Sequence, residues 1–265
     1  MTSSDSVMVE RRGQVVVAAI NRPDVFNALD AVVVGRLRDV VLDAESDPDL
    51  RAVVVTGSGE KAFSAGADLK ELAGMDADTA HETMRRGQRA FRQIEQAEVP
   101  VIAAVNGLAL GGGFELVLAT TFPVLSTRAA LGLPESSLGL IPGYGGTQRL
   151  SRAVGRRVAA HLMLTGLRLD PERAFALGLT PMAPVEPAEL IPTAIRVAET
   201  IASQGPNAVR SILHLITRGE DSTLDAGTAL ETGLAALAIA GRESSEGIAA
   251  FLERRPPTFA ATGQE

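Results

Sequence analysis

The chain has 265 residues, with 25 lysines and arginines against 32 aspartates and glutamates, which gives a net charge of −7 at pH 7. It contains no cysteine and three histidines, which lie far apart in the sequence. These counts exclude a disulfide framework, a thiol nucleophile, a cysteine-ligated zinc and a two-histidine metal site on one helix. The length suits one large domain with a substantial core. If the protein is an enzyme, we expect carboxylates to carry its proton transfers.

The acidic charge opposes general nucleic-acid binding, and a single tyrosine with no tryptophan leaves few side chains on which bases could stack. A polyanionic ligand would therefore need local rather than global attraction. Residues 1–12 contain acidic side chains and no apolar run, so the sequence predicts neither a signal peptide nor a transit peptide there. We expect a cytoplasmic protein.

Residues 99–119 are the most apolar stretch and are long enough to suggest a membrane span. The stretch also contains Pro100, Asn106, Glu115 and three consecutive glycines, which a lone helix in lipid would not tolerate together. A buried strand, a turn and a helix fit better, so we expect no membrane partner.

The first half of the chain alternates strand and helix patterns. Runs rich in Val and Ile predict strands at 14–20, 52–56, 101–105 and 122–126. Helical spacing of apolar residues predicts helices at 30–44, 79–97 and from about 112. Strands separated by helices indicate parallel pairing. Beyond Gly146 the pattern is helical, at 147–154, 155–165 and 171–177.

Four amphipathic helices are predicted after residue 188, divided near Gly205, Gly219 and Gly241. We divide the chain into a core of residues 1–200 and a helical C-terminal oligomerisation region of residues 201–265. The apolar face of the third helix can pack against the chain's own core or against another copy, and the sequence favours neither. This face comprises Leu230, Leu234, Leu237 and Ala238.

Residues 61–72, KAFSAGADLKEL, follow the strand at 52–56 and so lie at the carboxyl end of a parallel strand, where open α/β sheets bind ligands. The small side chains at 65–67 leave the backbone accessible. An ordinary strand-to-helix turn, with Asp68 capping the next helix, also explains the segment, and taken alone it is the preferred explanation.

Residues 104–118, AVNGLALGGGFELVL, also follow a buried strand. Consecutive glycines cost chain entropy unless the backbone must approach something closely or adopt positive φ. They precede an apolar helix, so the N–H groups of Gly112 and Gly113 are expected at its N-terminus, where they suit a developing negative oxygen. Glu115 is either a first-turn acid favoured by the helix dipole or a partly desolvated carboxylate with a raised pKa.

Residues 131–150, LGLPESSLGLIPGYGGTQRL, place Glu135 directly after Pro134. A Pro-Glu helix start explains this pair by itself. Two lone glutamates in apolar, glycine-rich surroundings favour a functional explanation over a structural one, because an unpaired buried carboxylate is costly and persists where function needs it. Free amides can stabilise an enolate or thioester oxyanion and carboxylates can move protons beside it, which is chemistry α and β to a carbonyl.

Four motifs in order resemble those of the crotonase (enoyl-CoA hydratase/isomerase) superfamily. They are NRPDVFNAL at 21–29, AFSAGADLKEL at 62–72, VNGLALGGGFEL at 105–116 and GLPESSLGLIPGYGGTQRL at 132–150, and RRPPTF at 254–259 adds a C-terminal match. The resemblance implies an α/β fold, a crotonase-like spiral of ββα units with a helical C-terminal region. It also implies a homo-oligomer, a trimer or a dimer of trimers.

By position in these motifs, the resemblance implies that the amides of Ala67 and Gly112 form an oxyanion hole and that Glu115 and Glu135 are the catalytic acid–base pair. It assigns the binding of an acyl-CoA substrate to residues of the first, second and fourth motifs, with Lys70 and Arg22 near the phosphates as the local cations that an acidic protein needs. The binding residues so implied are Ala65, Gly66, Asp68, Leu69, Lys70, Arg22 and Gly143.

Both acidic positions of the motifs are occupied by glutamate, which in this superfamily implies a hydratase that converts a trans-2-enoyl-CoA to the 3-hydroxyacyl-CoA. The resemblance implies no metal and no cofactor beyond the coenzyme A of the substrate. Phe114 departs from the common residue at its position, and we expect the change to alter packing close to the acyl pocket. Another crotonase reaction, such as enoyl-CoA isomerisation, and an idle oligomeric scaffold remain alternatives. A serine hydrolase is opposed by the absence of a G-x-S-x-G elbow.

Overall fold

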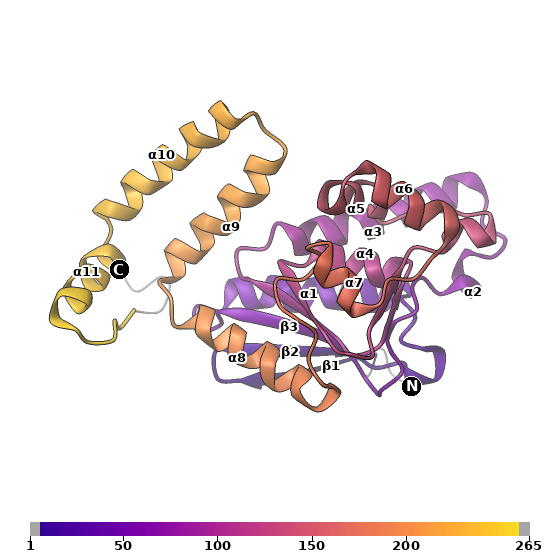
Figure 1. The fold of residues 1–265 in the computed structure, drawn as a ribbon, viewed down its shortest axis with the longest axis horizontal. Coiled ribbons are helices and arrows are strands. Elements are labelled where there is room, and N and C mark those ends of the chain that lie inside the picture. Colours follow the sequence, from indigo (N-terminus) through magenta and orange to yellow (C-terminus); the bar gives the residue numbers. More distant parts are fainter. Residues whose placement is uncertain (1–5, 260–265) are drawn as a thin grey trace.

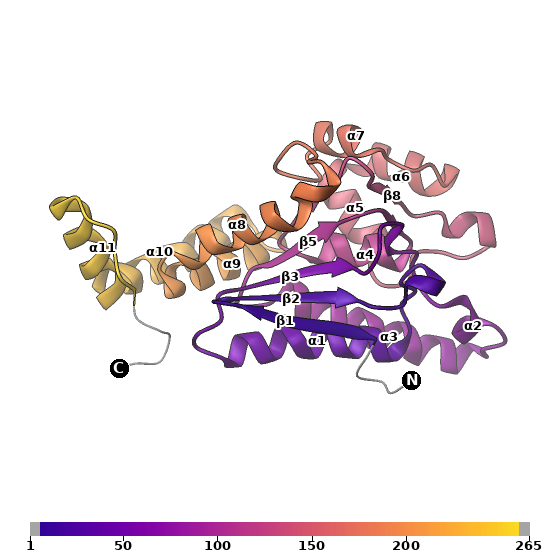
Figure 2. The same cartoon turned by 90° about the horizontal axis from the view of Figure 1, so that it is seen from below.

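A computed structural model describes residues 6–259 (Figure 1). Residues 1–5, the start of the segment for which the sequence predicts no targeting signal, and residues 260–265, the end of the predicted C-terminal region, lie outside the described residues. A layered α/β core is followed by three helices that extend away from it (Figures 1 and 2).

The core contains two β-sheets. The larger has the strand order β1-β2-β3-β5-β7, in which β1 and β2 are antiparallel and the other pairs are parallel. Its strands are β1 (Val7–Arg12), β2 (Val15–Ile20), β3 (Ala52–Gly57), β5 (Val101–Val105) and β7 (Phe122–Leu125). The smaller sheet is parallel, with β4 (Ala62–Ser64), β6 (Leu108–Leu110) and β8 (Ala130–Gly132) in that order.

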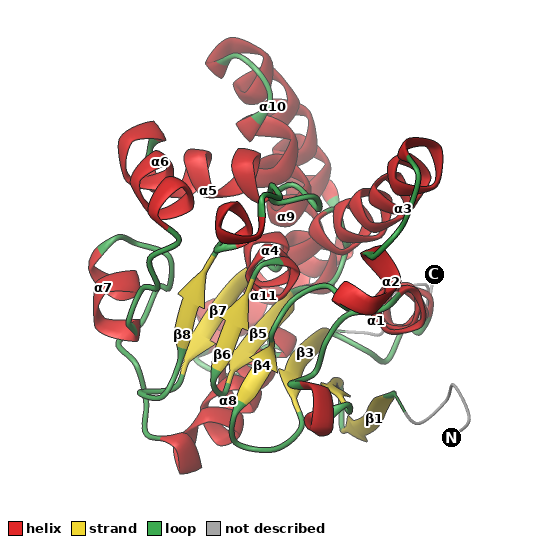
Figure 3. Ribbon diagram, turned by 90° about the vertical axis from the view of Figure 1, so that its right-hand side faces the viewer, coloured by secondary structure: helices red, strands yellow, loops and turns green. Residues whose placement is uncertain are grey.

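From β3 onward the chain repeats one step: a strand of the larger sheet, a strand of the smaller sheet, then helix (Figure 3). This repetition is the spiral of ββα units that the resemblance implies. The helices of the core are α1 (Ala31–Ser46), α2 (Leu69–Leu72), α3 (Ala77–Glu95), α4 (Gly112–Ala119), α5 (Gly146–Val154), α6 (Arg156–Thr165), α7 (Pro171–Ala176) and α8 (Leu190–Ala202). Short 3₁₀ turns lie at Pro23–Val25, Glu135–Leu138 and Pro187–Glu189.

From β2 onward the strands of the larger sheet are buried on both faces, to which successive side chains point alternately, whereas most of β1 is exposed. On β2, Val16, Ala18 and Ile20 join the core beneath α1, α3 and α4, whereas Val15 and Val17 pack in a second cluster with α8. Figure 2 shows α8 on one side of the sheet and α1 on the other. Apolar residues on both faces explain why the strand runs read as continuous rather than alternating.

The four predicted strands and the predicted helices of the core are present, and the Asp30 carboxylate caps α1 by accepting from Val33 N–H at 2.8 Å. Strands β1, β4, β6 and β8 were not predicted. Residues 99–119 form β5, β6 and α4 in the core. Among the described residues, no helix combines the length and the hydrophobicity needed to cross a membrane.

Three helices follow the core: α9 (Pro206–Glu220), α10 (Leu224–Ala240) and α11 (Arg242–Glu253). They match the predicted divisions near Gly205, Gly219 and Gly241. No residue of α10 is buried, and Leu237 is 70% exposed. Within residues 6–259 of one copy, the core therefore does not cover the apolar face of α10.

Candidate active site

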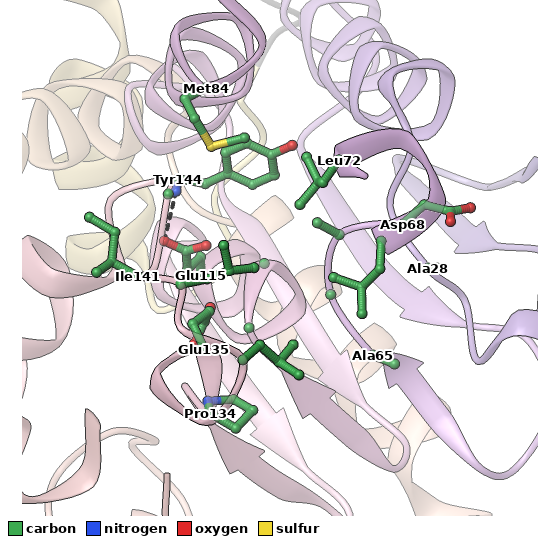
Figure 4. Close-up of a pocket in the computed structure, with 18 of the residues that line it drawn as sticks. Ala28, Ala65, Asp68, Leu72, Met84, Glu115, Pro134, Glu135, Ile141 and Tyr144 are labelled. Atoms are coloured by element: carbon green, nitrogen blue, oxygen red, sulfur yellow. Dashed lines mark hydrogen bonds between the residues drawn. The ribbon is translucent and has the colours of Figure 1, made fainter. Parts of the chain in front are cut away.

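A pocket of about 360 Å³ lies at the carboxyl ends of the smaller sheet (Figure 4). Each parallel strand leads directly into it: β4 into residues 65–68, β6 into Gly111 and Gly112, and β8 into Pro134 and Glu135. The carboxyl edge of a parallel sheet is where α/β folds gather ligand-binding groups. The three sequence motifs that follow strands thus meet in one cavity.

Two backbone N–H groups in this pocket are free. Ala67 N–H and Gly112 N–H have no hydrogen-bond partner within residues 6–259. Gly112 begins α4, so its N–H lies at the positive end of the helix dipole. A side chain on Gly112 would begin 3.4 Å from the Ala67 nitrogen, so the two peptides are close neighbours. The pair is suited to holding one oxygen atom.

Gly66 makes this approach possible. Its φ is +100°, and a Cβ there would stand 2.7 Å from the Leu110 carbonyl oxygen, so the position requires glycine. Leu29 holds the segment of residues 66–68 in place, since its N–H donates to Gly66 O at 2.8 Å and its carbonyl accepts from Asp68 N–H at 2.9 Å. The peptide between them is held while the Ala67 N–H stays free.

Glu115 lies in the first turn of α4 and is 2% exposed. One carboxylate oxygen, Oε1, accepts from Tyr144 N–H at 2.8 Å and from Gly146 N–H at 2.7 Å. Burial raises the pKa of Glu115 from 4.5 to about 7; the Gly146 N–H opposes this rise and the charge of Glu135 adds to it. A carboxylate with a pKa near neutral pH is well matched to accepting a proton.

Glu135 opens the 3₁₀ turn after β8. Its Oε1 lies beside Gly111, where a Cβ would meet it at 3.0 Å, and its Oε2 is buried without a hydrogen-bond partner in the described part of the chain. Burial raises the pKa of Glu135 above its ordinary value. A buried polar atom without a partner is costly to the fold, and at a pocket wall it is available to a ligand.

The loop that carries the donors to Glu115 is fixed from outside the pocket. Arg149 of α5 donates to the Tyr144 carbonyl at 2.8 Å and forms a double ion pair with Glu95 of α3, at 2.7 and 3.0 Å. Gln88 of α3 donates to the Gly143 carbonyl at 2.8 Å. Sequence reasoning missed these residues, because Glu95 and Arg149 are far apart in the chain and no local pattern links them.

All the predicted site residues except Arg22 line the pocket. The Arg22 guanidinium instead pairs with Asp30 and Asp68, each at 3.0 Å, and donates to the Ala28 carbonyl. Two carboxylates already balance its charge, so it braces the loop that carries Asp68. A contact between Arg22 and a phosphate stays a prediction.

Phe114 is not part of the pocket wall, and an effect of this residue on the packing close to the acyl pocket stays a prediction. Its side chain is 1% exposed and packs in the main core. Because α4 is apolar on every side, the sequence does not indicate which of its residues face the cavity. Among residues 6–259, no three His, Asp or Glu side chains gather closely enough to hold a metal ion.

Comparison with known proteins agrees with this geometry. The family model described as "Enoyl-CoA hydratase/isomerase" matches residues 10–262. The chain is 38% identical to the crotonyl-CoA hydratase of Syntrophomonas wolfei, over 96% of this chain and 98% of that one, and 38% identical to the short-chain-enoyl-CoA hydratase of Clostridium acetobutylicum, over 95% and 96%. A crystal structure of an enoyl-CoA hydratase from Bacillus anthracis superposes with a TM-score of 0.92 at 38% identity, covering 96% of this chain and 98% of that one. The chain belongs to the enoyl-CoA hydratase/isomerase family.

Proposed function

We propose that the protein is an enoyl-CoA hydratase, which adds water across the trans-2 double bond of an enoyl-CoA to give the 3-hydroxyacyl-CoA. The observation that carries the proposal is the placement of two carboxylates, the buried Glu115 and the partly buried Glu135, around a pair of free backbone amides. The names of the two bacterial relatives support the same reaction.

The thioester oxygen of the substrate accepts from Ala67 N–H and Gly112 N–H. When water attacks Cβ, electrons move onto this oxygen and an enolate forms. Fixed donors aimed at a developing negative charge contribute about 3–4 kcal/mol each to lowering a barrier of this type. The amides therefore lower the barrier to the attack of water on Cβ by stabilising the enolate that forms.

The two carboxylates move the protons. Glu115 keeps Oε1 on the two loop amides, and its other oxygen takes a proton from the water that attacks Cβ. The neutral Glu135 carboxyl gives a proton to Cα as the enolate collapses. Burial raises the pKa of Glu135, which is the direction that favours a proton donor, and the pKa of about 7 leaves Glu115 partly ionised at neutral pH.

Coenzyme A lies along the β4–α2 segment in this proposal. Residues 65–69 offer backbone groups to the adenine end, and Lys70 supplies a local cation for the phosphates. The substrate brings the only coenzyme that the mechanism uses. The cytoplasmic location stays a prediction.

We propose further that the chain forms a homo-oligomer, a trimer or a dimer of trimers, through α9–α11. Large apolar side chains on these helices are open to solvent in the single chain, at a density that marks a surface covered by another protein. They include Leu237, Ile239, Ile248, Phe251 and Leu252.

Exchanging each carboxylate for its amide tests the reaction. Glu115→Gln and Glu135→Gln should each lower crotonyl-CoA hydration by about 100-fold or more, because each removes one proton transfer. The matched control is Glu71→Gln on α2, whose carboxylate caps Ala31 N–H at 3.3 Å outside the pocket lining. Circular dichroism checks that each variant is folded.

Near-normal turnover in either active-site variant would contradict the assignment. Product analysis separates the alternatives: a 3-enoyl-CoA product would indicate an isomerase. A folded wild-type protein that binds acyl-CoA without any turnover would indicate a scaffold.

A further inference from the structure

Tyr144, the only tyrosine of the chain, holds its ring between two glycines. A Cβ on Gly87 of α3 would stand 2.2 Å from the ring atom Cε1, and a Cβ on Gly112 of α4 would stand 3.4 Å from Cδ2. The ring therefore fills the space between α3 and the start of α4. It is 7% exposed and lines the pocket.

One face of α3 fixes this ring. Met84, Gly87, Gln88 and Phe91 have the spacing i, i+3, i+4 and i+7, which places them on the same side of a helix. Phe91 meets the Tyr144 ring edge to face, with centroids 5.1 Å apart, and Gln88 holds the preceding carbonyl of Gly143. Since Gly87 has no side chain, the ring packs directly on the helix backbone and has a rigid support behind it.

The ring lies beside the two free amides. The point beside Gly112 that is 3.4 Å from Tyr144 Cδ2 is also 3.4 Å from Ala67 N, so ring and amides border the same small volume. A thioester oxygen held by these amides places the first acyl carbons alongside the ring. In Figure 4, Tyr144 and Met84 lie on the opposite side of the two glutamates from Pro134, while Asp68 and Ala65 mark the side where coenzyme A is proposed to lie.

We propose that the Tyr144 ring limits the length of the acyl chain and makes the protein selective for short enoyl-CoA substrates, with crotonyl-CoA preferred over longer homologues. The inference rests on the proposed hydratase function. The ring cannot retreat, because α3 packs against it at Gly87 and Phe91. A longer acyl chain must displace it or turn toward the pocket mouth at Ile141, which is 78% exposed.

The wild-type protein gives the first test. We expect kcat/KM for hydration to fall from crotonyl-CoA to 2-hexenoyl-, 2-octenoyl- and 2-decenoyl-CoA, by about tenfold or more over the series, since one methylene in a tight apolar pocket changes kcat/KM by that order. Equal kcat/KM for crotonyl-CoA and 2-decenoyl-CoA would overturn the inference, because the tail would then leave past Ile141.

Variants at residue 144 give the second test. Tyr144→Ala should raise the ratio of kcat/KM for 2-octenoyl-CoA to that for crotonyl-CoA by about tenfold or more, because it removes the ring and keeps the backbone N–H that serves Glu115. Tyr144→Leu opens part of the same space and guards against a poorly folded alanine variant. Tyr144→Phe keeps the ring and should keep the wild-type ratio.

A control away from the pocket, Leu164→Ala on α6, should leave the ratio unchanged, because this side chain is exposed and does not line the pocket. If the wild-type protein hydrates enoyl-CoA but Tyr144→Ala and Tyr144→Leu both keep the wild-type ratio of kcat/KM values, the role of the ring is rejected and the hydratase function stands. Absence of hydration of every enoyl-CoA by the folded wild-type protein would reject the proposed function itself.

Discussion

Glu115 is a residue whose burial suits the proposed reaction but lowers the stability of the fold. Its carboxylate is buried among apolar side chains, and the two loop amides compensate only part of the lost hydration. A shift of the pKa from 4.5 to about 7 corresponds to about 3 kcal/mol that disfavours the ionised form in the folded protein. The fold tolerates this cost at a position where a proton acceptor is needed.

The stability of Glu115→Gln should reveal this cost. Between pH 4.5 and about 7 the folded protein binds more protons at Glu115 than the unfolded chain, so this group lowers the free energy of unfolding as the pH rises. Glutamine carries no such term, and its carbonyl oxygen can still accept from the loop amides. Urea unfolding should show the variant gaining about 2–3 kcal/mol on the wild type between pH 5 and pH 8. A gain that does not depend on pH would contradict the raised pKa.

The rate of hydration should carry the same signature. As the pH falls below about 7, Glu115 takes up a proton and can no longer accept one from water. We expect kcat/KM for crotonyl-CoA to decrease about tenfold for each further pH unit well below that point. Initial rates between pH 5.5 and pH 8.5 measure the profile, and a flat acid side would show that Glu115 is not the base.

Residue types and motifs were enough to predict Glu115 and Glu135 as a pair. The sequence analysis offered a raised pKa of Glu115 only as one of two alternatives, because the shift depends on burial and on two opposing N–H groups that lie about thirty positions along the chain. The selective role proposed for Tyr144 was hidden for a similar reason: this loop residue has neighbours, Gly87 and Gly112, that come from two distant helices.

Among the elements, α3 and α5 have a part in the site without supplying a reacting group. Glu95 of α3 and Arg149 of α5 hold the loop whose amides bind Glu115. The Arg149 side chain is 14% exposed, so this pair is less screened by solvent than the other ion pairs of α3. We regard Arg149 as a positioning residue.

Arg149→Met should lower kcat by about tenfold or more, with a smaller change in KM, because the loop loses its anchor at the Tyr144 carbonyl. The variant should also move the acid side of the pH profile to higher pH, since the charge of Arg149 lowers the pKa of Glu115. Arg149→Lys should recover part of the loss, because lysine keeps the charge and loses the two-pronged geometry.

Arg152→Met on the same helix is the matched control, since Arg152 is half exposed and pairs with Asp221 outside the pocket. A purely structural role for Arg149 would lower stability without moving the pH profile. That outcome would count against the positioning role.

Strand length decided how much of the fold the sequence predicted. The strands of the larger sheet from β2 on carry long apolar runs and were found. The strands of the smaller sheet have three residues each, too few to display a period of two, yet they deliver the site residues to the pocket. Glycine patterns and the family resemblance located the site where strand prediction did not.

At the scale of the whole molecule, the exposed face of α9–α11 is the feature that a single chain leaves open. The sequence showed that an apolar face exists and not what covers it, because helical spacing is the same for either partner. The structure shows that, within the described residues, the chain's own core does not cover this face, since no residue of α10 is buried.

Charged substitutions on this face should weaken the proposed oligomer. Leu237→Glu on α10 and Phe251→Glu on α11 place a charge where an apolar contact is expected, and light scattering during gel filtration should show a shift to smaller species. Leu164→Glu on α6 is the control, with similar exposure on the core. A wild-type protein that runs as a monomer at micromolar concentration would refute the proposed assembly.

The amides of residues 67, 112, 144 and 146 come from the main chain, and this has an evolutionary consequence. Any amino acid but proline supplies an N–H at residue 144, so its side chain is free to diverge while Glu115 keeps its donor. Gly146 has no such freedom, because a Cβ there would stand 2.9 Å from Glu115 Cγ. Single substitutions at position 144 can thus change the range of substrates in this scaffold while the catalytic groups stay the same.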